Sequence, residues 1–244
     1  MDRISPTRRP TGQTVGNQRW RDLLFLHWPV APQLLQDLLP AGLTIDTFDG
    51  KAYIGVVPFA MFGVRPWWLP KWMAFDFLET NVRTYVHYQG SGPGVYFFSL
   101  DAASWLAVQA ARIGWSLPYY YAQMSMHKKA EQIEYKLTRS NNQSAMMDVS
   151  YTPLAPVDSS DPAGLPFFLA ERYLLYTEKS SVLYRGQVYH TPYPLQQVRV
   201  EHCQQGLVQA AGVHGEFAMP PLAHYAAGVD VDIFPLLPVS RAKI

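Results

Sequence analysis

The chain contains one cysteine, Cys203, in 244 residues. A single cysteine excludes an intrachain disulfide framework and any zinc site built mainly from cysteines. Cys203 lies in the stretch VEHCQQG, which has no turn or glycine motif typical of a catalytic thiol. The seven histidines form no HxxxH or HExxH pattern, so a metal site would require residues far apart in sequence to converge. We therefore expect no metal and no cofactor.

Charge is also scarce, since charged residues make up only 16% of the chain and the formal net charge is +1. Proteins that bind nucleic acid electrostatically need a basic surface, so we expect no nucleic-acid partner. No window reaches the roughly 18 apolar residues needed to span a bilayer. The basic start, MDRISPTRRP, has no apolar run behind it, unlike a signal peptide. These absences predict a cytoplasmic protein without a membrane partner.

The motifs of several common enzyme classes are missing as well. Neither GxGxxG nor GxxxxGK[ST] occurs, which removes the two usual nucleotide-binding loops. The GxSxG motif of serine hydrolases is absent too. Function therefore has to be inferred from the strand pattern and its polar residues.

Apolar surface, in contrast, is abundant: hydrophobic residues make up 48% and aromatic residues 14%, enough for a large core. The pattern predicts roughly nine or ten strands and three or four short helices, one of them over residues 165–176. This indicates a mostly β, α+β protein of barrel or sandwich type. We expect a flexible segment over residues 1–19 and one domain over residues 20–244. Residues 152–164, rich in Pro, Ser and Asp, predict a lobe boundary or a long loop.

The stretch FLETNVRTYVHY alternates and provides the first candidate site. Glu79, Asn81 and Arg83 share one face of the predicted strand. If that face lines a lumen, Arg83 would bind a carboxylate or phosphate with its planar fork. Glu79 would serve as a general acid or base where burial raises its pKa. The alternative is an ordinary strand whose polar face meets water.

The stretch ARIGWSLPYYYAQM provides the second candidate site. Strand alternation places Tyr119 and Tyr121 on one face and Tyr120 on the other, so at most two tyrosines share a cavity. The stretch predicts either a strand with tyrosines on both faces or the floor of a binding cavity. Arg112, at the end of the preceding predicted helix, suits either the helix dipole or a ligand. Glu171 and Arg172, adjacent in the helix predicted at residues 165–176, are expected to project in different directions.

Several longer stretches together resemble a known family. They include HWPVAPQLLQDLLPAGLTIDTFDGKAYIGVVPF, LETNVRTYV, GVYFFSLDA, FLAERYLLY and PLAHYA followed by GVDV. These resemble the YqjF-like family, "domain of unknown function 2071", from about Trp20 to Pro235. That family is similar, more distantly, to acetoacetate decarboxylases. The resemblance implies a closed or conical β-barrel around an internal cavity, with Glu79 on a strand that faces it.

The resemblance also bears on the chemistry. Acetoacetate decarboxylases use a buried lysine that forms a Schiff base with a β-keto acid. Their lysine pair falls on Tyr119 and Tyr120 of this chain, after Pro118, and a phenol cannot form an imine. Lys128 and Lys129 lie at a predicted hairpin turn, where adjacent charges are expected to be solvated. Schiff-base decarboxylation is therefore not expected.

Two main functions remain open. The first is a lysine-independent lyase or hydrolase-type enzyme that acts on a small carboxylate- or carbonyl-containing molecule. The second is a non-catalytic protein that binds an apolar or mixed ligand on the same scaffold, and a third, weaker one is a barrel with a filled lumen. A homo-oligomer is a further expectation, with Trp67, Trp68 and Trp72 as a subunit contact. The predicted catalytic residues are Glu79, Tyr119 and Tyr120, and the predicted ligand-binding residues are Asn81, Arg83, Arg112, Arg65, Glu171, Tyr176 and His190.

Overall fold

The computed structural model describes residues 1–66, 69–105, 108–109 and 117–239. The strands are β1 (Gly16–Val30), β2 (Leu43–Ile45), β3 (Ala52–Pro66), β4 (Phe75–Tyr88), β5 (Ser91–Ala102), β6 (Tyr119–Lys129), β7 (Gln132–Arg139), β8 (Asn142–Pro156), β9 (Leu174–Lys179), β10 (Val182–Tyr189), β11 (Leu195–Gln205), β12 (Leu222–Ile233) and β13 (Leu237–Pro238). The helical elements are η1 (Ser5–Thr7), α1 (Pro32–Gln36), η2 (Lys71–Met73), α3 (Leu165–Ala170) and α4 (Leu207–Ala210). The predicted fold class, mostly β with a few short helices, is confirmed.

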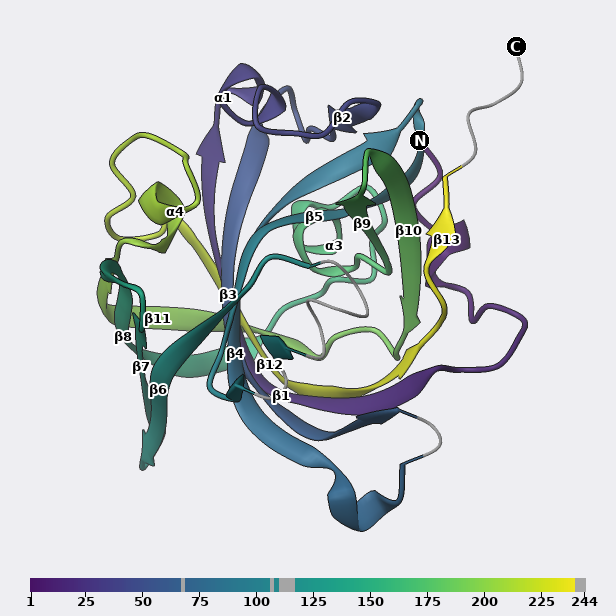
Figure 1. Cartoon of the computed structure of the whole chain (residues 1–244). Coiled ribbons are helices and arrows are strands. Elements are labelled where there is room, and N and C mark those ends of the chain that lie inside the picture. The colour runs from purple at the N-terminus through teal and green to yellow at the C-terminus, as the bar shows by residue number, and fades with distance from the viewer. Residues whose placement is uncertain (67–68, 106–107, 110–116, 240–244) are drawn as a thin grey trace.

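The strands form one sheet that closes on itself twice. Its order is β13-β10-β9-β5-β6-β7-β8-β11-β12-β1-β3-β4-β2, with additional pairings between β4 and β5 and between β10 and β12. One ring runs through β5-β6-β7-β8-β11-β12-β1-β3-β4, and a smaller one through β5-β9-β10-β12-β1-β3-β4. Both rings contain β12-β1-β3-β4-β5, which we call the common wall (Figure 1).

The rings separate because the outer strands of the common wall change partners along their length. On β5, Val95 and Tyr96 pair with β9, whereas Leu100 and Ala102 pair with β6. On β12, residues near Ala226 pair with β11 and those near its end pair with β10. The two groups of strands then cover opposite faces of the common wall.

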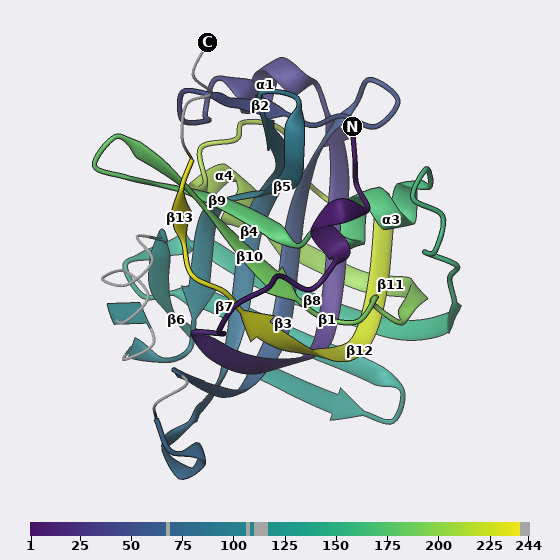
Figure 2. The ribbon, with the colours of Figure 1, turned by 90° about the vertical axis from the view of Figure 1, so that its right-hand side faces the viewer.

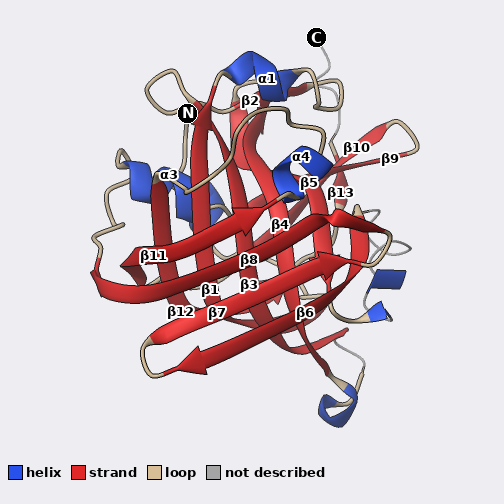
Figure 3. Cartoon of the chain, turned by 90° about the vertical axis from the view of Figure 1, so that its left-hand side faces the viewer, coloured by secondary structure: helices blue, strands red, loops and turns tan. Residues whose placement is uncertain are grey.

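The large interior lies between the common wall and the strands β6, β7, β8 and β11, which Figure 3 shows in front. Its wall residues include Leu24, Leu26, Val56, Val82 and Val86. They pack against β7 and β8 through Tyr135, Leu137, Met147, Val149 and Tyr151. This interior is an apolar core.

The small interior lies on the opposite face, where β9, β10 and α3 cover the common wall (Figure 2). One cluster there joins wall residues such as Phe25 and Val57 to Tyr193 and Leu195. Another joins Tyr53, Tyr85 and Val95 to Phe168 and Leu169, around α3. Because successive side chains of a strand point to opposite faces, each strand of the common wall supplies both interiors.

Gly94 allows β5 and β9 to approach each other. A Cβ atom at this position would lie 2.6 Å from the Leu174 carbonyl oxygen. We expect Gly94→Ala to lower the free energy of unfolding by about 1–3 kcal/mol, because a backbone strand would have to move. Chemical denaturation measures this, with Ser91→Ala on the same strand as a control expected to change stability by less than about 0.5 kcal/mol. Equal stability of the two variants would contradict the close approach.

The helix predicted over residues 165–176 is too long. The α3 helix ends at Ala170, Glu171 has left helical geometry, and β9 begins at Leu174. The following residues pair with β10 and β5, so tertiary pairing overrides helix propensity here. The sequence also predicts a helix over residues 101–114, but β5 continues through Ala102.

The first residues of the chain lie against the barrel. Gln187 donates a hydrogen bond to the Pro6 carbonyl, and β1 begins at Gly16, inside the predicted flexible segment. In the predicted loop at residues 152–164, β8 continues to Pro156. None of the helices in the described part of the chain has the length and apolar character of a membrane span. Trp67 and Trp68 of the expected oligomer contact lie outside the described residues, and Trp72 is exposed.

Candidate functional site

Glu79 and Tyr119 meet in the structure. The Tyr119 hydroxyl donates a hydrogen bond of 2.7 Å to Glu79 Oε2, and both residues are buried. Glu79 lies on β4 and pairs with Ala102 of β5, whereas Tyr119 pairs with Leu100 of the same strand. Strand β5 therefore brings together two residues that sequence analysis had predicted separately.

The protonation of this pair follows from its burial. The pKa of Glu79 is raised to about 8. Burial is the main cause, the Tyr119 hydrogen bond opposes it, and the nearby Asp101 carboxylate adds to it. Burial also raises the pKa of Tyr119 well above its ordinary value, with Glu79 adding to the effect. Near neutral pH a mostly neutral carboxyl thus lies beside a neutral phenol, and each group has a proton to donate.

Arg83 lies four residues after Glu79 on the same face of β4, and it is 8% exposed. Its Nη2 donates to the Leu169 carbonyl at 3.3 Å, and its Nε has no hydrogen-bond partner. The guanidinium lies 5.5 Å from the centre of the Phe25 ring and 5.8 Å from that of Tyr85. None of the ion pairs among the described residues includes Arg83.

Two further buried polar atoms near Arg83, one on Asn81 and one on His190, lack hydrogen-bond partners. Asn81 lies between Glu79 and Arg83, and its Oδ1 has no hydrogen-bond partner. His190 places Nδ1 at 2.8 Å from the Thr191 carbonyl, so Nδ1 carries the proton and Nε2 is an acceptor without a partner. Burial lowers the pKa of His190 to about 4, which keeps the ring neutral. Burying such groups unpaired costs free energy that a polar ligand would recover.

Tyr120 points the other way, as strand alternation predicts. Its ring packs 3.9 Å from the guanidinium carbon of Arg139. Arg139 forms two hydrogen bonds of 2.7 and 2.8 Å with the Asp101 carboxylate, and both residues are buried. Tyr120 therefore contacts an internal ion pair rather than Glu79. Sequence analysis missed this pair, because nothing local connects two residues that lie 38 positions apart.

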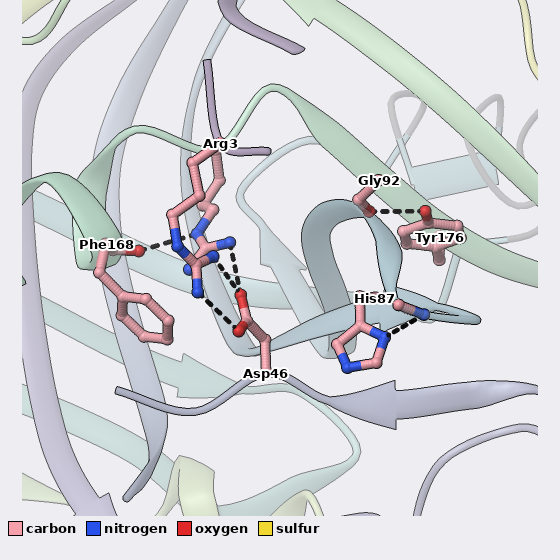
Figure 4. Close-up of polar contacts among 8 residues, drawn as sticks. Arg3, Asp46, His87, Gly92, Phe168 and Tyr176 are labelled. Atoms are coloured by element: carbon pink, nitrogen blue, oxygen red, sulfur yellow. Dashed lines mark hydrogen bonds and ion pairs between the residues drawn. The ribbon is translucent and has the colours of Figure 1, made fainter. Parts of the chain in front are cut away.

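The remaining predicted ligand-binding residues are dispersed. Tyr176, on β9, donates to the Gly92 carbonyl at 2.7 Å, on a strand pair away from Glu79 (Figure 4). Arg65 donates to the Leu69 carbonyl and lines a surface groove away from Glu79. Glu171 is buried beside the small interior, next to Tyr193. Arg112 lies outside the described residues.

Arg172 is buried, like its neighbour Glu171. The sequence predicts that both residues lie in a helix and project from it in different directions. Arg172 Nη1 donates to Asp46 at 2.9 Å, and Arg3 donates to the same carboxylate (Figure 4). The α3 helix ends at Ala170, before both residues. Their side chains have different partners, Tyr193 for Glu171 and Asp46 for Arg172, and both side chains are buried. Burial lowers the pKa of Arg172 to about 10, while Asp46 opposes that change.

The lysines whose side chains the structure describes lie at the surface. Lys51, Lys128, Lys129, Lys136 and Lys179 are all exposed. Lys128 is not simply solvated, because its Nζ lies 2.7 Å from Asp22 Oδ1. Within the described ranges, no group of three or more His, Cys, Asp or Glu side chains is arranged to hold a metal ion.

Several solved structures share this architecture, and acetoacetate decarboxylases are among them. Acetoacetate decarboxylase from Legionella pneumophila matches with a TM-score of 0.64 and 13% identity, over 97% of this chain and 93% of that chain. The enduracididine biosynthesis enzyme MppR, complexed with pyruvate, matches with a TM-score of 0.66 and 11% identity, over 96% and 93%. An acetoacetate decarboxylase-like enzyme from Sphingomonas wittichii RW1 matches with a TM-score of 0.62 and 15% identity, over 96% of this chain and 98% of that chain. These similarities show the fold.

The family is shown by sequence. The chain belongs to the DUF2071 family, described as an uncharacterized conserved protein, whose profile matches residues 17–230. It is 39% identical over 231 residues to the uncharacterized protein YqjF of Bacillus subtilis (strain 168), covering 93% of each chain. The resemblance seen in the sequence motifs is confirmed.

Proposed function

We propose that the chain binds a small carboxylate- or carbonyl-containing molecule on the face of β4 that bears Glu79 and Arg83, and acts on it by acid–base chemistry. The observation that carries this proposal is the buried Glu79–Tyr119 contact on the strand face that also bears Arg83. Arg83 would bind the carboxylate through its unpartnered donor. Tyr119 would donate a hydrogen bond to a carbonyl oxygen as negative charge develops there, and Glu79 would supply or accept the proton.

The chemistry we propose uses no Schiff base. The five lysines named above are exposed, and an imine-forming lysine needs a buried, desolvated site that lowers its pKa. The fold relative MppR was solved with pyruvate, which contains both a carboxylate and a carbonyl. That ligand class matches the two donors of the proposed site, Arg83 for the carboxylate and the Tyr119 phenol for the carbonyl.

We predict that Arg83→Gln weakens the binding of small 2-oxo and 3-oxo carboxylates about 10- to 100-fold, the equivalent of one lost charge-assisted hydrogen bond. Isothermal titration calorimetry with pyruvate and acetoacetate measures this on the full chain. Arg199→Gln is the matched control, because Arg199 is an exposed arginine on β11 that pairs with Glu201. Equal affinity of the Arg83→Gln variant and the unmodified chain would rule out Arg83 as the carboxylate ligand.

Turnover is tested separately from binding. Glu79→Gln keeps an acceptor for the Tyr119 hydroxyl but removes the titrating carboxyl, so it should abolish turnover of any substrate found and retain binding. Borohydride treatment with β-keto acids should leave every lysine unlabelled. Binding without turnover in the unmodified chain would favour the alternative, a binding protein whose cavity wall includes Phe25, Phe168 and Tyr193.

A further inference from the structure

Glu171 is a second buried carboxyl group on this side of the molecule, and the proposed chemistry does not use it. It is 5% exposed. Its Oε1 accepts the Tyr193 backbone N–H at 2.8 Å, and its Oε2 accepts the Tyr173 hydroxyl. None of the ion pairs in the described part of the chain includes Glu171. A buried carboxylate normally has a cationic partner, because its desolvation is otherwise poorly offset.

Glu171 also lines a groove with a volume of about 440 Å³. The size lies within the range typical of small-molecule sites. Its walls are the segments 156–160 and 192–196 together with Phe167. The ionisable groups that line it, apart from the Tyr193 phenol, are the carboxyls of Asp158 and Glu171. Such a groove, with aromatic rings and carboxylates, suits an organic cation.

Tyr193 connects this groove to Arg83. Tyr193 lines the groove, and its ring packs edge-on against the Phe25 ring, with 5.2 Å between the ring centres. The Arg83 guanidinium lies over the same Phe25 ring, 5.5 Å from its centre. The Tyr193 hydroxyl lies within electrostatic reach of both Arg83 and Glu171. The carbonyl that Arg83 contacts belongs to Leu169, two residues before Glu171. Among the described residues, an arginine without a carboxylate partner and a carboxyl group without a cationic partner therefore flank one tyrosine.

We propose that the ligand of this protein is a zwitterion. Its carboxylate would bind Arg83, and a cationic nitrogen several bonds away, an ammonium or guanidinium group, would bind Glu171 from the groove. Each charge of the ligand then supplies the counter-ion that one buried side chain lacks. This inference rests on the proposed function, because it takes the Arg83 carboxylate site as given and adds the second charge.

Matched ligand pairs test the second charge directly. Pairs of equal chain length are 4-aminobutyrate with butyrate, 5-aminovalerate with valerate, and 6-aminohexanoate with hexanoate. We expect at least one amino acid to bind the full chain ten times or more tightly than its partner, as one charge-assisted hydrogen bond provides. In Glu171→Gln this ratio of dissociation constants should fall to about 1, while Arg83→Gln should weaken both members of each pair. Glu178→Gln, a control at an exposed carboxyl on β9 that does not line the groove, should keep the ratio.

The outcomes separate the two proposals. Binding of the alkyl carboxylates that depends on Arg83, without preference for any amino acid, would overturn the zwitterion and leave the carboxylate site standing. Failure of every carboxylate to bind would overturn both. A preference that persists in Glu171→Gln would overturn the role of Glu171. In Glu171→Gln the amide oxygen can still accept the Tyr193 N–H, and the amide NH2 can donate to the Tyr173 hydroxyl oxygen once that hydroxyl rotates. Circular dichroism and thermal unfolding should therefore show a folded variant in which the ratio can be read.

Discussion

Replacing Arg139 with methionine is expected to lower the free energy of unfolding by about 3–5 kcal/mol, the largest loss we predict for a single substitution. The change leaves the Asp101 carboxylate in a dry interior without its two hydrogen bonds from Arg139. It also removes the cation that stacks on Tyr120. Urea denaturation followed by tryptophan fluorescence measures the loss.

A double variant distinguishes the loss of the partner from the loss of volume. Asp101→Leu combined with Arg139→Met removes both charges, so it should recover a large part of the stability, since a buried ion pair often contributes little beyond an apolar pair. A double variant as unstable as Arg139→Met alone would show that packing around Tyr120 dominates. An Arg139→Met variant as stable as the unmodified chain would contradict the burial of this ion pair.

The stability of the chain is also expected to depend on the protonation of Glu79. Folding raises the pKa of this carboxyl from an ordinary value near 4.5 to about 8, so the folded state holds a proton that the unfolded chain has released. The contribution of this bound proton to the free energy of unfolding is therefore complete below about pH 4.5, and it is lost as the pH rises to about 8. The slope reaches about 1.4 kcal/mol per pH unit within that window.

Glu79→Gln isolates this contribution, because the amide does not titrate across the window. Buried histidines with lowered pKa values, such as His190, act in the opposite direction, but they are present in both proteins. We expect the difference in unfolding free energy between the two proteins to shift in favour of Glu79→Gln by several kcal/mol from pH 5 to pH 8. Denaturant titrations at closely spaced pH values measure it, and a constant difference would place the Glu79 carboxyl in water.

Strand alternation carried most of what the sequence predicted correctly. The period of two in FLETNVRTYVHY placed Glu79, Asn81 and Arg83 on one face, and all three are buried in the structure. The same rule separated Tyr119 from Tyr120, which lie against Glu79 and Arg139 respectively. Local patterns of this kind survive because strand geometry fixes side-chain direction whatever the partner strand is.

Pairing over long distances in the chain escaped prediction. Which strand covers which face depends on the exchange of partners along β5 and β12, and no local pattern encodes it. For the same reason the contacts of Glu171 with Tyr193 and of Arg172 with Asp46 were missed. Residues 165–176 have an apolar pattern that suits a helix, yet pairing with β5 and β10 places the last three of them in β9.

The common wall has a consequence for how such a protein can diversify. Along β4, residues such as Val82 and Val86 fill the apolar core, whereas Glu79, Asn81 and Arg83 line the polar side. A slip of one residue in the pairing of β4 would exchange the two sets and bury charges in the apolar core, so its register is tightly specified. Within that register, successive side chains of β4 contact opposite faces of the wall, so a substitution on one face does not change the side chains on the other. Substitutions at one set can alter the chemistry of the molecule while the other set continues to supply its stability.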